Sequence, residues 1–356
     1  MARIVKVDPV NPDKRVLEEA AHVLRLGGLV AFPTETVYGL GCDAFNGDAA
    51  TKVFEAKGRP RDNPLIIHLS STDQLNQVAS DVPDEAYGLV KKFWPGPLTL
   101  ILRKSPNVPP EVTGGRDTVA VRMPAHPVAL GLIDELGRPI AAPSANKAGR
   151  PSPTKADHVV EDFGGSPMVD LILDGGPTFF GIESTIVDLT KDPPVLVRPG
   201  PYSVDEISAA LGKEIEVPGF ARGLGEAVEA IAPGAKYRHY APDTPLMLVE
   251  CNNETGLAFA IEAVARELMG KGLKVAVLAT EELARRLEGL GIKVIIMGSR
   301  SNLYTVAKSL FDSLRLLDKS GVDVGIVEGL YEAGIGLAIM NRVRKASGGR
   351  IINCRQ

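Results

Sequence analysis

Several sequence features that would point directly to a class of protein are scarce or absent here. It contains three cysteines, Cys42, Cys251 and Cys354, and their spacing fits no metal motif. Scattered cysteines of this kind predict unpaired thiols in a reducing compartment and neither a disulfide framework nor structural zinc. No stretch approaches the roughly eighteen apolar residues that a membrane helix needs, and the amino terminus lacks an apolar signal segment. We therefore expect a cytoplasmic protein without a membrane partner.

A strong charge of one sign and a wealth of aromatic residues are also missing. The formal net charge is -4, and Phe, Trp and Tyr together make up 5% of the residues. Proteins that coat nucleic acid usually carry a strongly basic surface, and readers of single-stranded RNA display stacking platforms. Any anion site in this chain is therefore expected to be local.

Several catalytic motifs are absent as well. The sequence has no Walker-type phosphate loop and no Gly-x-Ser-x-Gly elbow, which disfavours a P-loop nucleotidase and covalent acyl catalysis. No paired spacing that would suggest a metal centre occurs among the histidines, which are His22, His68, His126, His158 and His239. We therefore predict no metal site built from protein ligands.

What is present is an alternation of strands and helices over a chain of 356 residues, a length that favours about two domains. Apolar runs at 29–32, 65–69, 98–102 and 117–122 predict strands, and helical periodicity at 13–26, 48–57, 83–93 and 126–136 predicts helices between them. We expect a first α/β domain over 1–212, with a twisted, mixed open sheet. Residues 213–245 lack periodicity and predict a linker, and 246–356 show βα repeats typical of a smaller Rossmann-like domain.

The most informative stretch runs from Lys57 to His68, with the sequence Lys-Gly-Arg-Pro-Arg-Asp-Asn-Pro-Leu-Ile-Ile-His. Two prolines fix the backbone torsion φ, and Gly58 frees the backbone between Lys57 and Arg59. A rigid turn beside an apolar strand aims its cations, so the stretch favours an anion site, although a solvated basic turn is the plain alternative.

Other strands also end in polar or cationic residues. Arg122 and Arg198 each close a predicted strand, and Pro143-Ser-Ala-Asn-Lys-Ala-Gly-Arg-Pro-Ser152 follows another. Arginine binds phosphate or carboxylate through paired hydrogen bonds, and Ser144, Asn146 and Ser152 can donate to phosphate oxygens. This inventory suits phosphoryl or nucleotidyl transfer, in which the protein supplies mainly orientation and electrostatic stabilisation. An ordinary turn that satisfies its own backbone remains the alternative for the Ser-Ala-Asn loop.

Five motifs follow one another along the first domain: Pro33-Thr-Glu-Thr-Val-Tyr-Gly-Leu40, Lys57-Gly-Arg-Pro60 with Asn63-Pro-Leu65, Pro95-Gly-Pro-Leu-Thr99, Val121-Arg-Met-Pro124 and Pro143-Ser-Ala-Asn146. Taken in this order, they resemble the Sua5/YrdC family of threonylcarbamoyl-AMP synthases. Each motif is weak by itself, but the five in this order are specific. The resemblance covers roughly residues 10–200, and the added linker and α/β domain are similar to the long form of the family.

The resemblance implies a nucleotidyltransferase that uses ATP, L-threonine and bicarbonate, with Mg²⁺ on the nucleotide phosphates and no dedicated protein ligand for it. Its product would serve the machinery that transfers threonylcarbamoyl to tRNA. The family pattern assigns these roles by similarity: Lys57 and Arg59 to catalysis; Thr36, His68, Arg122, Ala142 and Ser184 to threonine; and Arg59, Asn63, Thr118, Ser144, Asn146, Ser152, Arg198, Tyr237 and Tyr240 to ATP. The two tyrosines would belong to a linker that folds over the adenylate and excludes water.

Two other functions stay open at the level of sequence. The same basic surface could belong to an RNA-binding module, whose affinity would fall steeply with salt and would need no threonine, and a weak contact with tRNA is compatible with either function. A carbamoyl-handling module of a larger hydrogenase-maturation enzyme is a third interpretation. No acylphosphatase-like or zinc-finger segment accompanies this chain to support it.

Overall fold

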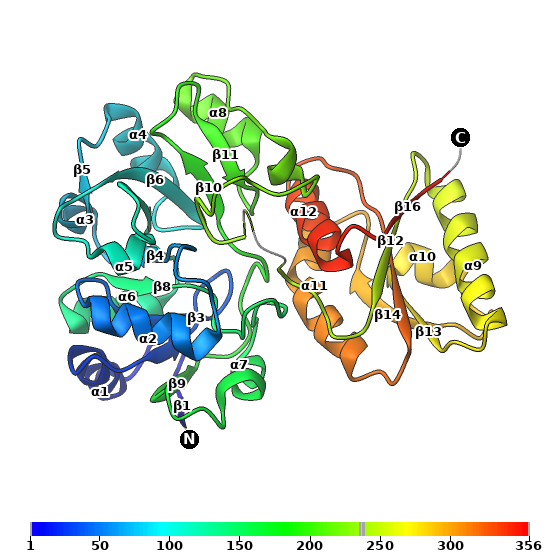
Figure 1. Ribbon diagram of the computed structural model, residues 1–356, viewed down its shortest axis with the longest axis horizontal. Coiled ribbons are helices and arrows are strands. Elements are labelled where there is room, and N and C mark those ends of the chain that lie inside the picture. The colour runs from blue at the N-terminus through cyan, green and yellow to red at the C-terminus, as the bar shows by residue number, and fades with distance from the viewer. Residues whose placement is uncertain (1, 235, 237–238, 355–356) are drawn as a thin grey trace. The chain divides into compact units, whose positions relative to one another are not determined.

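The computed structural model describes residues 2–234, 236 and 239–354, and these form two compact units (Figure 1). Of the described residues, those within 1–148, 152–221 and 225–237 belong to the first unit. Those within 149–151, 222–224 and 238–356 belong to the second. Each unit has its own sheet, so each is described separately.

The first unit is organised around an eleven-stranded mixed sheet. The strand order is β1-β9-β2-β3-β8-β4-β7-β6-β10-β11, and β5 pairs with β6. The strands are β1 (Arg3–Lys6), β2 (Val30–Phe32), β3 (Gly39–Asp43), β4 (Ile66–His68), β5 (Ala79–Ser80), β6 (Leu98–Lys104), β7 (Thr118–Arg122), β8 (Ile140–Ala142), β9 (Leu171–Asp174), β10 (Thr185–Asp188) and β11 (Val195–Arg198).

Helices of the first unit begin and end where local signals predict. Asp13 caps one helix by accepting from the Arg15 backbone N–H, and Ser203 and Glu206 form a capping box at another. The α-helices are α1 (Lys14–Arg25), α2 (Gly47–Lys57), α3 (Leu75–Val78), α4 (Asp84–Phe93), α5 (Pro110–Thr113), α6 (Pro127–Leu136), α7 (Ala156–Phe163) and α8 (Val204–Leu211), with 3₁₀ turns at η1 (Thr72–Gln74) and η2 (Gly219–Arg222).

Two different elements cover one face of this sheet. Helices α1 and α6 pack their buried leucines and alanines against Phe32, Ile140 and neighbouring residues of β2, β8 and β9. Farther along the sheet, Ala227, Ile231 and Ala232 pack against Ile66 of β4 and apolar residues of β6, β7, β10 and β11. These three residues belong to 213–245, the predicted linker, whose described residues are called the irregular segment below. Ile66 lies opposite Ala142, so both clusters cover the same face. His68 and Arg122 lie on that face, because each is two residues along its strand from a residue of the second cluster.

The second unit is a five-stranded parallel sheet in the order β14-β13-β15-β12-β16. Helices α9 and α10 pack on one face of it, and α11 and α12 lie on the other (Figure 1). Its elements are β12 (Leu246–Glu250), α9 (Glu254–Gly270), β13 (Val275–Thr280), α10 (Glu281–Arg286), β14 (Lys293–Gly298), α11 (Leu303–Asp318), β15 (Val324–Glu328), α12 (Gly336–Ser347) and β16 (Ile351–Asn353).

The predicted fold class is confirmed, both for the mixed sheet and for the smaller Rossmann-like sheet. The predicted strands and helices are present with small shifts at their ends. Four strands were not predicted: β1, β3, β5 and β16. No helix among the described residues is both long and apolar enough to cross a bilayer.

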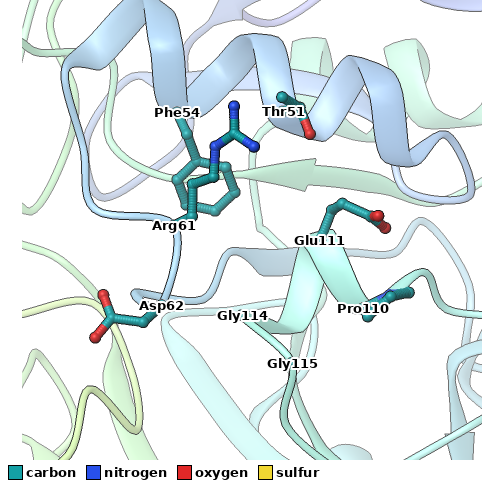
Figure 2. A pocket seen from close by; sticks show the side chains of 8 residues that line it. All are labelled: Thr51, Phe54, Arg61, Asp62, Pro110, Glu111, Gly114 and Gly115. Atoms are coloured by element: carbon teal, nitrogen blue, oxygen red, sulfur yellow. The ribbon is translucent and has the colours of Figure 1, made fainter.

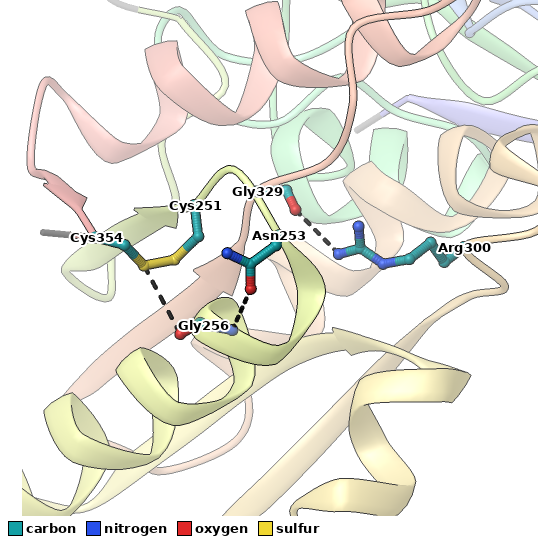
Figure 3. The surroundings of a disulfide bond; sticks show 6 residues. All are labelled: Cys251, Asn253, Gly256, Arg300, Gly329 and Cys354. Carbon is teal, nitrogen blue, oxygen red and sulfur yellow. Dashed lines mark hydrogen bonds between the residues drawn. A yellow bond between two sulfur atoms is a disulfide. The ribbon is translucent and has the colours of Figure 1, made fainter. Parts of the chain in front are cut away.

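The expectation of unpaired cysteines is wrong for two of the three. Cys251 and Cys354 form a disulfide, with their Cα atoms 5.0 Å apart, and Cys42 is a buried free thiol (Figure 3). The disulfide joins the residue after β12 to the residue after β16, two neighbouring parallel strands. Sequence spacing could not reveal this pairing because 103 residues separate the two cysteines.

Candidate functional site

A buried hydroxyl-rich turn connects β2 to β3 and forms one wall of the candidate site. The Thr34 hydroxyl donates to the carbonyl of Val37 at 2.7 Å and accepts from the backbone N–H of Thr36 at 3.2 Å. The backbone N–H of Phe180 donates to the carbonyl of Glu35 at 2.9 Å. The Thr36 hydroxyl also lies 2.9 Å from that of Thr34. The turn therefore holds the Glu35 backbone without using the Glu35 side chain.

Arg122 reaches this turn from the end of β7. Its Nη1 donates to the Thr36 hydroxyl at 2.9 Å, and its Nη2 lies 2.6 Å from Oε1 of Glu35. The ion pair is almost fully buried, but its atoms are not aligned for hydrogen bonding. Nε and Nη2 of Arg122 and both oxygens of Glu35 therefore make no hydrogen bond to the described residues.

The sheet register places other predicted residues beside Arg122. His68 lies opposite Arg122 on β4, Thr99 lies opposite it on β6, and Ile186 of β10 then pairs with both Thr99 and Arg198. Directly paired residues project from the same face of a sheet. His68, Arg122 and Thr99 thus form a transverse polar row, although they are far apart in sequence.

His68 is a neutral imidazole in this row. Burial and the nearby Arg122 guanidinium lower its pKa from 6.5 to about 3, in that order of importance. Its Nδ1 lies 3.0 Å from the carbonyl of Ile66, and Phe32 contacts the ring edge-on. His68 can therefore exchange hydrogen bonds with a ligand near neutral pH without adding a second cation beside Arg122.

Ser184 and Arg198 extend the row toward β11. The Ser184 hydroxyl lies 2.7 Å from that of Thr99 and accepts from Nη2 of Arg198 at 3.1 Å. Nε of Arg198 also donates to the Ser184 carbonyl, and its Nη1 donates to the carbonyl of Pro233, both at 3.1 Å. The guanidinium is therefore fixed in position and bridges the sheet to the irregular segment.

The three cations of the loop after α2 point in different directions. Lys57 is buried and its Nζ donates to the carbonyls of Ser144 and Asn146, while Arg59, also buried, donates to the carbonyls of Asn63 and Pro64 at 3.1 Å. Arg61 is exposed and pairs with Glu55 at 3.0 Å. The plain alternative of a solvated basic turn therefore describes Arg61 but not Lys57 or Arg59.

The predicted nucleotide-side residues lie in the loop after β8 and around it. Ser144 donates to Oδ1 of Asn146 at 2.6 Å, and Ser152 donates to Glu183 at 2.6 Å. Asn63 is buried, and its Oδ1 has no hydrogen-bond partner among the described residues. Thr118 begins β7 at partial exposure, and Ala142 ends β8 opposite Ile66.

A cavity of about 310 Å³ opens beside the same cationic loop (Figure 2). Phe54 and Thr51 of α2, Arg61 and Asp62 of the loop, and Pro110, Glu111, Gly114 and Gly115 line it. Gly114 has φ of +61°, and a Cβ there would meet the carbonyl of Asp62 at 2.8 Å, so only glycine fits this close approach. Arg61 lines this cavity, whereas Lys57 and Arg59 do not.

Tyr240, which was predicted to contact the nucleotide, packs within the second unit. Its ring stacks on Phe311 with 5.2 Å between the ring centres, and the Arg342 guanidinium lies 5.6 Å from the ring centre. Tyr237 lies outside the described residues. Sequence reasoning gave no role to Glu35, Thr99 or Glu183, although Glu35 lies inside the first motif that was singled out.

The geometry alone defines an α/β protein with a candidate site for an anion. Buried arginines, a neutral histidine and hydroxyls meet on one face of its sheet, and no cluster of three acidic, histidine or cysteine side chains that could hold a metal ion occurs among the described residues. Comparison with known proteins makes this class specific. The Sua5/YciO/YrdC family model, described as "Telomere recombination", matches residues 22–200. The model described as "Threonylcarbamoyl-AMP synthase, C-terminal domain" matches residues 202–348.

Individual relatives match over nearly the whole chain. The threonylcarbamoyl-AMP synthase of Pyrococcus abyssi is 50% identical over 94% of both chains, and that of Bacillus subtilis is 48% identical over 97% of this chain and 96% of its own. The crystal structure of P. abyssi Sua5 complexed with L-threonine superposes with a TM-score of 0.92 at 48% identity, covering 99% of both chains. The chain therefore belongs to the Sua5/YrdC family of threonylcarbamoyl-AMP synthases, in its long form with both family domains.

Proposed function

We propose that this protein joins L-threonine, bicarbonate and ATP into threonylcarbamoyl-AMP, with release of pyrophosphate and water, for the threonylcarbamoyl modification of tRNA. The observation that carries the proposal is Arg122, a buried cation with unsatisfied donors between the Thr36 hydroxyl and His68. A buried guanidinium favours a carboxylate partner, and the related P. abyssi protein has been crystallised with threonine. The reaction would take place in the cytoplasm, where the machinery that transfers threonylcarbamoyl to tRNA would consume the product.

On the threonine side, Arg122 would bind the carboxylate, while Thr36, His68 and Ser184 would exchange hydrogen bonds with the polar groups of the amino acid. Ala142, which is small and buried at the end of β8, would leave room for the ligand. No enzyme nucleophile is required, because the carbamate oxygen of the substrate would itself attack the α-phosphorus.

On the nucleotide side, Arg59, Asn63, Thr118, Ser144, Asn146, Ser152 and Arg198 would hold ATP. The Lys57 ammonium group donates to the carbonyls of Ser144 and Asn146. Its proposed catalytic role is therefore to orient the loop that would face the phosphates. Arg59 is oriented by the carbonyls of its own turn. Preorganised cations of this kind stabilise charge that develops on phosphate oxygens.

Mg²⁺ would be held by the ATP phosphates, because no metal-binding cluster occurs among the described residues. When bound, it would neutralise part of the charge on the departing pyrophosphate. The residues of this chain would bind and orient the reactants around it.

The irregular segment is proposed to cover the reacting groups, as part of a division into a catalytic domain (1–212), a linker (213–245) and a C-terminal domain (246–356). Support comes from the packing of Ala227, Ile231 and Ala232 on the site face of the sheet and from the bond between Arg198 and the Pro233 carbonyl. A segment in this place excludes water from a reactive adenylate. In the structure the Tyr240 ring stacks on Phe311. For this ring to cover the adenylate, it would have to leave Phe311 during the reaction cycle, and Tyr240→Ala should then lower turnover.

The deciding experiment is to measure pyrophosphate release from ATP with and without threonine and bicarbonate. Release should require both, and Arg59→Ala should reduce it, whereas Arg61→Ala, the exposed neighbour, should not. Pyrophosphate release that does not depend on threonine would refute the proposal. If no release occurs but the protein binds RNA with a steep salt dependence, the RNA-binding alternative takes its place.

A further inference from the structure

Glu35 is a buried carboxylate in the site that the sequence motifs left without a role. The turn between β2 and β3 fixes its backbone through Thr34 and Phe180, and its side chain is 7% exposed. Neither carboxylate oxygen makes a hydrogen bond to the described residues, and Arg122 lies within 2.6 Å.

A purely structural role does not explain this arrangement. A buried charge loses its hydration and is normally compensated by a full set of hydrogen bonds. Here both carboxylate oxygens and the Nε and Nη2 atoms of the guanidinium lack a hydrogen bond to the described residues, although the two groups lie 2.6 Å apart. A ligand that carries both a carboxylate and a cationic donor would complete both groups.

We propose that Glu35 binds the α-ammonium group of the amino-acid substrate and removes a proton from it before the nitrogen attacks carbon dioxide or bicarbonate. This inference rests on the proposed function. In an α-amino acid, the ammonium and the carboxylate are attached to the same carbon. A carboxylate on Arg122 therefore brings the ammonium next to a group that lies 2.6 Å from that arginine.

Such a base is needed because an α-ammonium group has no lone pair, and amines of this kind are largely protonated at neutral pH. One ammonium proton passes to Glu35 and from there to solvent, and the nitrogen lone pair forms the new C–N bond. A second proton leaves the nitrogen and joins the hydroxyl group of bicarbonate, which departs as water. Threonine zwitterion and bicarbonate thus give the N-carboxylate, water and one proton, and no oxidant or reductant is involved.

The charged and titratable groups around Glu35 are Arg122 of β7, His68 beside that arginine on β4, and His126 before α6. His126 lies close enough for the Glu35 charge to raise its pKa, although burial lowers that pKa more. His68 is already neutral near physiological pH, as described above, and so is not a second base that would titrate in this range. Glu35 is therefore the carboxylate of this cluster.

The first test compares Glu35→Gln with wild type in threonine-dependent pyrophosphate release, with Glu55→Gln, an exposed glutamate on α2, as the matched control. We expect Glu35→Gln to lower kcat about a hundredfold at neutral pH, as is typical for loss of a general base. Its rate should then rise with pH as solution supplies the free amine, while the Glu55→Gln profile matches wild type. A wild-type kcat and pH profile in Glu35→Gln would overturn the inference while leaving the proposed function intact.

A second test uses wild-type protein and therefore does not depend on how the variant folds. Wild type should bind L-threonine at least tenfold more tightly than 2,3-dihydroxybutyrate of the same configuration, in which a hydroxyl replaces the ammonium group, in calorimetric titrations. Glu35→Asp should narrow this preference and keep part of the activity. Equal affinity of wild type for the two ligands would contradict contact between Glu35 and the ammonium group. Failure of wild type to release pyrophosphate would instead refute the proposed function.

Discussion

Two arginine–glutamate pairs lie at strand ends in this protein, one in each unit, and they differ in how well their hydrogen bonds are satisfied. In the second unit, Glu328 ends β15, accepts from the backbone N–H of Thr280 and pairs with Arg300. Arg300 also donates to the carbonyl of Gly329 (Figure 3). In the first unit, Arg122 ends β7 and pairs with Glu35, and most of their polar atoms have no hydrogen bond.

We interpret this difference in hydrogen bonding as one between a structural ion pair, Glu328–Arg300, and a pair in the proposed binding site, Glu35–Arg122. The pair in the second unit borders a cavity of about 230 Å³ at the carboxyl edge of a parallel sheet, where ligands bind in many α/β proteins. Its charges are nevertheless already engaged by the protein, and so is the nearby Glu282, whose pKa falls to about 2 because backbone and Ser299 hydrogen bonds outweigh its burial. Position in the fold therefore does not distinguish the two pairs, whereas the incomplete hydrogen bonding of Glu35 and Arg122 does.

The largest effect is expected from Arg122→Ala. Removing the guanidinium deletes the proposed carboxylate partner and leaves Glu35 buried without a counter-charge. We expect kcat/KM for threonine to fall about a hundredfold to a thousandfold, with a smaller change in the KM for ATP. Steady-state kinetics with each substrate varied in turn would measure this. A uniform loss for both substrates would mean that Arg122 supports the fold and does not select threonine.

Next in size is the expected loss of stability when the pair in the second unit is broken. Glu328→Gln should lower the free energy of unfolding of that unit by about 3 kcal/mol, because Arg300 is only 13% exposed and loses its nearest counter-charge. Threonine-dependent turnover of the folded protein should not change. Denaturant unfolding, followed alongside activity, tests both statements.

The matched control replaces both members of that pair with apolar residues, as in Arg300→Met with Glu328→Leu. Such double replacements often recover much of the stability lost in a single one. A double variant as unstable as Glu328→Gln, or a large loss of turnover in either protein, would contradict the division between a structural pair and a binding pair.

Part of the fold and part of the candidate site could be predicted from the sequence. Periodicity located nearly all helices and the more apolar strands, and the ordered motifs pointed to Arg122 and His68. The pairing of these two residues could not be predicted, because it depends on β4 lying beside β7 in the sheet. β3 was missed because two of its five residues are glycines. A Cβ on Gly41 would come within 2.7 Å of Ile140 and Phe32, so packing and not strand propensity selects that residue.

The role of Glu35 and the contacts of Lys57 were hidden for a related reason. A motif names residue types but does not say which side chains find partners after folding. Lys57 finds the carbonyls of Ser144 and Asn146, 87 and 89 residues away, and Glu35 finds only an incompletely bonded arginine. Both outcomes depend on long-range geometry.

His68 gives a smaller effect that is specific to pH. Its folded pKa of about 3 lies below the ordinary value of 6.5, so below pH 6.5 the unfolded chain takes up a proton that the native protein does not. The stabilisation from neutral His68 is complete above pH 6.5 and is lost as the pH falls toward 3, at up to about 1.4 kcal/mol per pH unit. The stability of wild type relative to His68→Asn, measured by denaturant unfolding between pH 7 and 4.5, should show this slope. A pH-independent difference would mean that His68 titrates normally.

The smallest effect is expected at Arg61. Its replacement tests whether burial distinguishes Arg59, which is proposed to bind ATP, from Arg61, which is not. The Arg61 side chain is 68% exposed and pairs with Glu55, whose side chain is 50% exposed. A contact of this kind contributes at most a few tenths of a kcal/mol. Arg61→Ala should therefore change the free energy of unfolding by less than about 0.5 kcal/mol and leave the KM for ATP within about twofold of wild type. Nucleotide titrations and unfolding curves of Arg61→Ala and Arg59→Ala, measured side by side, make the comparison. If Arg61→Ala weakened ATP binding as much as Arg59→Ala, the nucleotide would have to reach the outer face of the loop and the cavity beside α2. Burial would then not distinguish the cation that binds the nucleotide from the one that does not.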